Sequence, residues 1–119
     1  MKIQSHRDLI VWQKAMDLAV LIYSLVAGLP SHERFGLCSQ ATRAAVSVAA
    51  NIAEGNARGT PKDYANFLAI ARGSLMETET YLLLAVRLEY LSEETAGPAM
   101  SLILEVDKML RSIRTKLLG

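Results

Sequence analysis

Hydrophobic residues recur every three or four positions along four stretches of the sequence, and this spacing is typical of amphipathic helices. Proline cannot continue a helical hydrogen-bond ladder, and the three prolines, Pro30, Pro61 and Pro98, separate the stretches. The pattern predicts three helices, over about residues 8–26, 37–57 and 61–90. A fourth helix is predicted to begin within residues 92–94, unless Gly97 and Pro98 delay its start or kink its first turns.

Short links between consecutive helices favour antiparallel neighbours. The sequence therefore predicts an all-α protein, an antiparallel up-down-up-down four-helix bundle, with residues 1–119 as a single domain. Trp12 and Tyr23 have the spacing of core residues within the first helix, so we expect both to be buried. Thr60, Pro61 and Asp63 form the start signature of the third helix.

The second helix has an unusually narrow polar side. On a helical wheel its polar residues share an arc of about 80°, and they are Gln40, Arg43, Ser47, Asn51, Glu54 and Arg58. Most of the remaining surface is alanine or another small or apolar residue, whereas a surface helix of a monomeric bundle usually hides a stripe of a little over 100°. We expect this helix to pack against its own bundle and against a neighbouring subunit. The alternative is that it is the central helix of a compact monomer.

The third helix combines small and charged residues in Arg72, Gly73, Ser74 and Glu77. This combination indicates a close helix crossing, at which Arg43 or Arg72 would form an ion pair with Glu54 or Glu77. Such pairs add little to the free energy of unfolding, but they can fix the register between two helices. A catalytic cluster is disfavoured because no nucleophile lies beside a base. The predicted structural and oligomer network comprises Arg43, Ser47, Asn51, Glu54, Gly55, Arg72, Gly73, Ser74 and Glu77.

Composition supports a helical protein and excludes several classes. Hydrophobic residues make up 51% of the chain but aromatic residues only 6%, and the 18 leucines and 16 alanines favour helix. Thirteen basic and 12 acidic residues leave a net charge of +1, so a nucleic-acid or anionic-membrane partner would have to be met locally. The single cysteine excludes a disulfide framework and favours a cytoplasmic location. Neither a signal pattern nor a membrane-spanning stretch is recognisable.

Residues for known catalytic chemistry are sparse. His6 and His32 do not belong to Glu-x-x-His motifs, so a di-iron or di-manganese bundle site cannot be built. A phosphate-cradling glycine loop is not recognisable, and Cys38 is more typical of a packed thiol than of a nucleophile. We expect no enzyme activity, cofactor, metal or small-molecule substrate.

Basic residues gather towards the two ends of the sequence, including Lys2 and Lys14. The candidate nucleic-acid-binding residues are Arg7, Lys14, Arg58, Lys62, Lys108, Arg111, Arg114 and Lys116. Asp107 lies in the same arc as Arg111 and can pair with it at i,i+4, which is typical of a solvated helix face. The solvated face is favoured, and the nucleic-acid site stays open.

Two stretches of the sequence form a motif that is specific enough to indicate a family. They are residues 40–55, QATRAAVSVAANIAEG, and residues 71–75, ARGSL, which Glu77 follows. Together they resemble the four-helix bundle protein family, also called the intervening-sequence protein family. Some members of that family are encoded within large-subunit ribosomal RNA genes. Residues 9–15 and 108–110 also fit, so the resemblance covers nearly the whole chain. Relatives include the accessory variability protein of diversity-generating retroelements.

The resemblance implies an antiparallel bundle that assembles into a ring-like homopentamer with no known catalytic activity. For the retroelement relatives it implies a basic barrel that binds nucleic acid and a reverse transcriptase, and the net charge of +1 departs from that pattern. The first hypothesis is therefore a non-enzymatic homo-oligomeric scaffold whose partner is RNA, DNA or a reverse transcriptase. The second is a protein-interaction or assembly module that binds no nucleic acid.

Overall fold

The computed structural model describes residues 5–119, which form four long helices and two short 3-10 turns. The long helices are α1 (Ile10–Val26), α2 (Leu37–Ala57), α3 (Pro61–Arg87) and α4 (Glu93–Leu118). The turn η1, His6–Asp8, precedes α1, and the turn η2, Ser31–Glu33, precedes α2. Because the described residues include no strand, the all-α prediction is confirmed.

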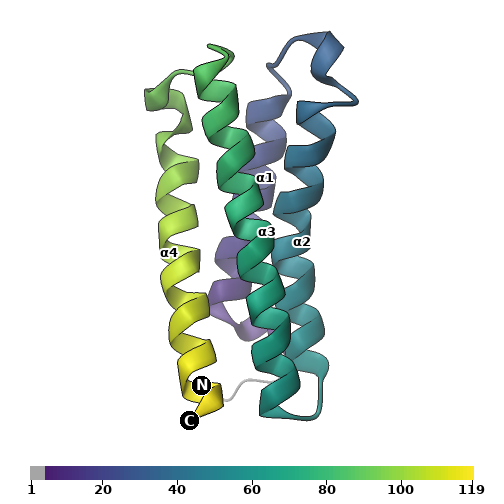
Figure 1. Cartoon of the computed structure of the whole chain (residues 1–119), viewed down its shortest axis with the longest axis vertical. Helices are drawn as coiled ribbons and strands as arrows, with labels where there is room; N and C mark the ends of the chain where they lie inside the picture. Colours follow the sequence, from purple (N-terminus) through teal and green to yellow (C-terminus); the bar gives the residue numbers. More distant parts are fainter. Residues whose placement is uncertain (1–4) are drawn as a thin grey trace.

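The four helices lie side by side along the longest axis of a bundle measuring 44 × 25 × 22 Å (Figure 1). Helix α1 contacts α2 and α4, and α3 also contacts α2 and α4, so the α1–α2 pair and the α3–α4 pair form opposite sides. We call the end with the α2–α3 link and the end of α4 the base. The opposite end, with the α1–α2 and α3–α4 links, is the crown (Figure 1).

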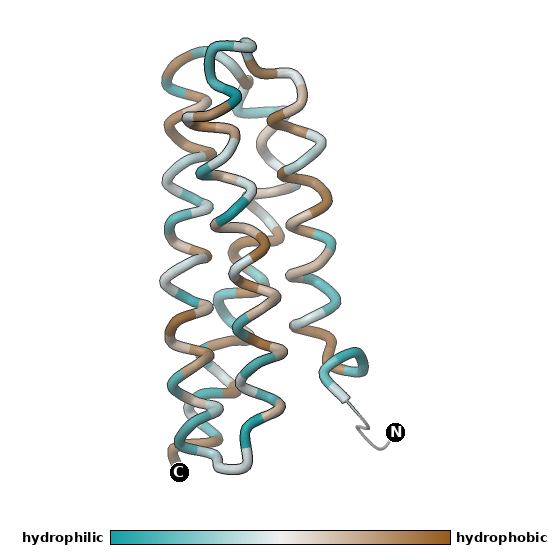
Figure 2. Tube along the Cα trace, turned by 90° about the vertical axis from the view of Figure 1, so that its right-hand side faces the viewer, coloured by the Kyte–Doolittle hydropathy of each residue, from teal (hydrophilic) through white to brown (hydrophobic). Residues whose placement is uncertain are grey.

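The core is built from aliphatic side chains of all four helices, and hydrophobic positions alternate with hydrophilic ones along each helix (Figure 2). In α1 the buried residues are Val11, Ala15, Leu18, Ala19 and Ile22. The expected burial is therefore wrong for Tyr23, which is 56% exposed, whereas Trp12 is half-buried and packs against the core. The series that begins at Val11 and the series that contains Trp12 and Tyr23 both have helical spacing. Only the series that begins at Val11 faces the core.

Capping side chains account for the helix starts. Helix α1 begins two residues later than predicted because Ser5 and Asp8 form a capping box around η1. The predicted cap of α3 is confirmed, since Thr60 Oγ1 accepts a hydrogen bond from the Asp63 amide at 3.1 Å. Helix α4 begins at Glu93 and continues through Pro98, so the proline does not delay the helix.

The remaining helix ends also have local causes. Helix α3 stops at Arg87, three residues before its predicted end, and Glu89 beyond it has a φ of 63°, in the left-handed region. Helix α2 has the predicted bounds. Among residues 5–119, the helices lack a stretch that is both long and apolar enough to cross a membrane.

Candidate functional site

Small polar side chains line the contact between α2 and α3. Ser47 Oγ lies 2.9 Å from Ser74 Oγ, and Asn51 Nδ2 donates to the carbonyl and hydroxyl oxygens of Ser47 at 2.9 and 3.0 Å. Thr78 is fully buried, and its hydroxyl donates to the Ser74 carbonyl at 2.9 Å. The contact thus brings together three predicted network residues. Thr78 was missed, although its position one turn after Ser74 is a usable signal.

Gly55 lies where α2 and α3 approach most tightly. A Cβ atom at this position would lie 2.7 Å from Phe67 Cβ and 3.0 Å from Tyr64 Cδ1, so a larger residue does not fit. Burial raises the pKa of Tyr64, against a smaller lowering by a hydrogen bond with Asn56. Gly73 differs, because a Cβ there would meet nothing within 4 Å. The two glycines of the predicted network therefore have different surroundings.

The ion pairs differ from those predicted. Arg72 Nε lies 2.6 Å from Asp107 Oδ1 on α4, whereas Glu54 pairs with Arg58, one turn along its own helix, at 3.3 Å. The expected pairings for Arg72 and Glu54 are therefore wrong, because each has a nearer partner.

Two predicted network residues share a small groove without forming a pair. Arg43 and Glu77 line a groove of about 230 Å³ beside Ser47 and Ser74, and within residues 5–119 no ion pair joins the two charges. The groove runs along the α2–α3 contact, so it extends the polar contact between Ser47 and Ser74 toward solvent.

Helices α1 and α2 also share an apolar surface that faces away from the core. It is hollowed into a groove of about 540 Å³, which we call the α1–α2 face, lined by His6, Trp12, Met16, Ala19, Val20, Tyr23, Val46, Ala49, Ala50 and Ala53. Val20 is 68% exposed and Val46 is 45% exposed. His6 packs edge-on against Trp12, with 5.0 Å between ring centroids. The second apolar side of α2 is thus continuous with an exposed apolar side of α1.

The candidate basic residues lie mostly toward the base. Lys14 Nζ pairs with Glu105 Oε2 at 2.9 Å, and Arg58 covers the ring of Phe67 at 4.8 Å. The predicted pair of Arg111 with Asp107 is confirmed at 3.3 Å. Lys2 lies outside the described residues. The candidates that residues 5–9, 51–66 and 107–119 bring to the base are Arg7, Arg58, Lys62, Lys108, Arg111, Arg114 and Lys116.

The fold separates charges that nearly cancel over the whole chain. The base segments, residues 5–9, 51–66 and 107–119, hold those seven basic residues and four acidic ones. The crown segments, residues 27–36 and 87–96, hold two basic and four acidic residues. The formal charge is therefore +3 near the base and −2 near the crown.

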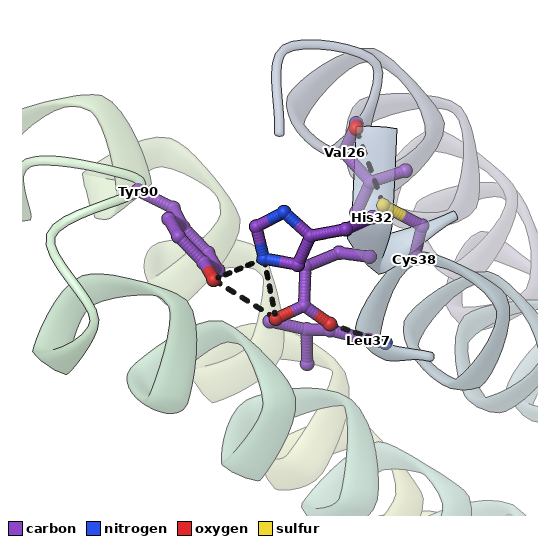
Figure 3. A network of polar contacts seen from close by, with 6 residues as sticks. Val26, His32, Leu37, Cys38 and Tyr90 are labelled. Carbon is purple, nitrogen blue, oxygen red and sulfur yellow. Dashed lines mark hydrogen bonds and ion pairs between the residues drawn. The ribbon is translucent and has the colours of Figure 1, made fainter. Parts of the chain in front are cut away.

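A polar network joins the two links of the crown (Figure 3). The Tyr90 hydroxyl donates to Glu33 Oε2 at 2.9 Å, and His32 Nε2 lies 3.3 Å from the same hydroxyl. Glu33 Oε1 also accepts from the Leu37 amide at 3.3 Å, and it thereby satisfies one of the free amides in the first turn of α2. The hydrogen bond to Glu33 raises the pKa of Tyr90. Cys38, half-buried nearby, donates its thiol to the Val26 carbonyl. These bonds connect the α1–α2 link to the α3–α4 link and to the first turn of α2.

Comparison with known proteins identifies the family. The chain matches the family model described as 23S rRNA-intervening sequence protein over residues 7–112. The chain belongs to this family. It is also similar to the crystal structure of a protein with unknown function from the S23 ribosomal protein family of Bacteroides thetaiotaomicron. That similarity has a TM-score of 0.79 and 30% sequence identity, and it covers 88% of this chain and 98% of the other. Among curated proteins, none matches.

In this member of the intervening-sequence protein family, the strings that carry the resemblance lie at the α2–α3 contact. Gly55 permits close approach, while Asn51 and Ser74 hydrogen-bond across or along the contact. Helix packing therefore explains these residue types without any reaction. Neither the family nor the structural neighbour is described as having an enzymatic activity.

Proposed function

We propose that this chain is a non-catalytic scaffold, an antiparallel up-down-up-down bundle of one domain that assembles in the cytoplasm into a homo-oligomeric ring. The observation that carries the proposal is the exposed α1–α2 face. Five copies per ring is the number that the family resemblance implies. The predicted network at the α2–α3 contact then holds each bundle in register.

The chemistry of the α1–α2 face fits a second copy of a helical protein. Met16, Val20, Tyr23 and Val46 are all exposed to solvent in the single chain. Contiguous apolar surface of this kind is uncommon on monomers, and each Å² removed from water contributes about 25 cal/mol. Alanines line the α2 side, and small side chains let a neighbouring helix approach to about 8 Å. The face thus suits close helix-on-helix packing.

Mass measurement tests the assembly directly. Wild-type protein is expected to have about five times the chain mass of 13.0 kDa in light scattering coupled to size-exclusion chromatography. Val20→Glu is expected to fall toward 13.0 kDa, because assembly would bury an unpaired carboxylate. Leu104→Glu is the matched control: Leu104 is similarly exposed, at 62%, but lies on α4. A wild type of 13.0 kDa at micromolar concentration, or equal masses for the two variants, refutes the proposal.

The partner that the charge distribution favours is RNA or DNA, or a reverse transcriptase that carries it. The excess of basic residues toward the base supports this, since a ring would place several such bases together. An electrophoretic shift with structured RNA and DNA at two salt concentrations tests the partner. Complexes that form at low salt and weaken steeply with salt are expected. If no complex forms at low salt, nucleic acid is not the partner, and the alternative function is supported: an assembly module that binds no nucleic acid.

A further inference from the structure

Three arginines converge on one groove between α3 and α4. The groove has a volume of about 540 Å³, and its lining includes Arg72, Arg111, Arg114, Gly73, Met76 and Leu110. It lies on the side of the bundle opposite the α1–α2 face. The sequence places Arg72 in the structural network that fixes helix register, and it places Arg111 and Arg114 among the candidate nucleic-acid-binding residues. The fold brings the three arginines together.

All three guanidinium groups are held through the Nε atom. Arg72 and Arg111 each direct Nε to a different carboxylate oxygen of Asp107, at 2.6 and 3.3 Å, and Arg114 Nε donates to the Ala65 carbonyl at 3.2 Å. A guanidinium carries five N–H donors, so this anchoring uses one donor and leaves the terminal amino groups of each fork. Anchored side chains lose less conformational freedom when they bind a ligand.

The charge and lining of the groove favour an anion with an organic part. Three positive side chains face a single carboxylate, that of Asp107, whose side chain is only 15% exposed. Leucine and methionine side chains form much of the remaining wall, and they suit the less polar part of a ligand. Gly73 leaves open space at the rim, since even a Cβ there would meet nothing within 4 Å. Arginine forks match the oxygens of a phosphate group.

We propose that this groove binds the phosphate group of a phosphate ester, carried either on a nucleotide or on a nucleic-acid backbone. Arg72, Arg111 and Arg114 donate to the phosphate oxygens, and Asp107 positions two of them. A single chain forms the groove, so a free nucleotide can bind without assembly. For nucleic acid, the inference rests on the proposed partner and names the atoms that meet it.

Binding assays on the full-length protein test the groove. The probes are fluorescein-labelled single-stranded RNA, adenosine monophosphate and inorganic phosphate. The variant Arg72→Gln/Arg114→Gln is expected to bind RNA or adenosine monophosphate at least about tenfold more weakly than wild type. Arg34→Gln/Arg87→Gln removes the same charge near the crown and is expected to stay within about twofold. The slope of the logarithm of the RNA-binding constant against the logarithm of the salt concentration is expected to become less steep by about one for each lost phosphate contact.

The outcomes separate the possible ligands and the possible roles. Binding of RNA alone supports a backbone phosphate, and binding of adenosine monophosphate supports a free nucleotide. Equal affinities of the two double variants overturn the proposal, as does a wild type that binds none of the probes at low salt. If the groove variant fails to fold, Arg72→Lys retains the charge beside Asp107 but not the fork. It is expected to bind at least about threefold more weakly, and undiminished binding would overturn the assignment.

Mass measurements keep this proposal separate from assembly. A 13.0 kDa wild type that binds adenosine monophosphate refutes the ring and supports the groove. A large assembly that binds no probe does the reverse. If the arginine variant changes mass but keeps its affinity for every probe, the arginines serve assembly and the groove proposal is overturned.

Discussion

Two glycine-to-alanine substitutions test how tightly α2 and α3 are packed. In Gly55→Ala, the new Cβ would lie 2.7 Å from Phe67 Cβ and 3.3 Å from the Tyr64 carbonyl oxygen. Both atoms are tied to the α3 backbone, so a rotation of a side chain cannot relieve the contact. In Gly73→Ala, the same methyl group enters open space. The chemical change is identical, and only the surroundings differ.

The expected magnitudes follow from two opposing effects. Alanine is favoured over glycine inside a helix by about 1 kcal/mol. Overpacking of a tight contact costs about 1–3 kcal/mol, and the cost at Gly55 belongs in the upper part of that range because backbone must move. Gly55→Ala should therefore lower the free energy of unfolding by about 1–2 kcal/mol. Gly73→Ala should raise it by up to about 1 kcal/mol, which leaves a gap of about 2–3 kcal/mol between the variants.

Urea unfolding followed by circular dichroism at 222 nm measures the gap. All samples need the same chain concentration, because assembly contributes to apparent stability. A Gly55→Ala variant as stable as wild type would show that α2 and α3 separate at no cost, and would refute the role assigned to Gly55. A destabilised Gly73→Ala variant would show that its surroundings are crowded, contrary to the open space around it.

Three further predictions concern single side chains. The pKa of Tyr90 is raised above 10.0, so the stability from its bond to Glu33 should be present below pH 10.0 and lost at higher pH. The free energy of unfolding of Tyr90→Phe should therefore fall less at alkaline pH than that of wild type, which unfolding curves at several pH values measure. Asp107→Asn should lower the free energy of unfolding by about 1 kcal/mol or less, and high salt should shrink the difference, because its arginine partners are exposed. Thr60→Ala should cost about 1 kcal/mol in thermal unfolding through the lost cap on the Asp63 amide.

Helix existence could be predicted from the sequence, but the buried face of α1 could not. Periodicity identified a helix over α1, and both Val11 and Trp12 begin series with helical spacing. The two series differ by one position, and each is mostly apolar, so spacing does not distinguish the core from a second apolar face. Packing against α2 and α4 buries Val11 and leaves Tyr23 exposed. A helix that is apolar on two sides needs tertiary information before its core can be named.

The polar contacts were predictable only where they depend on neighbouring helices with a short link. Ser47, Ser74 and Gly55 lie on α2 and α3, which only three residues connect, so their motifs constrain the pairing of the two helices. The partner of Arg72 depends on the level of α4 relative to α3. No local pattern encodes that level, and Asp107 was recognised only through Arg111, its neighbour one helical turn away.

The net charge of +1 therefore has a different meaning in the fold than in the sequence. Over the whole chain it argues against an electrostatic partner, but the base and crown carry charges of opposite sign. The α1–α2 face and the arginine groove also occupy opposite sides of the bundle, because α1 and α2 pack together and α3 packs on α4. A ring needs a contact between two different surfaces, because two copies that meet through the same face close into a dimer. The two proposals together therefore require that the α1–α2 face meet a surface of the next copy other than the α3–α4 side, which leaves every groove open. Adenosine monophosphate should then bind without changing the mass of the assembly, and a nucleotide that dissociates the ring would show that the groove lies in the contact.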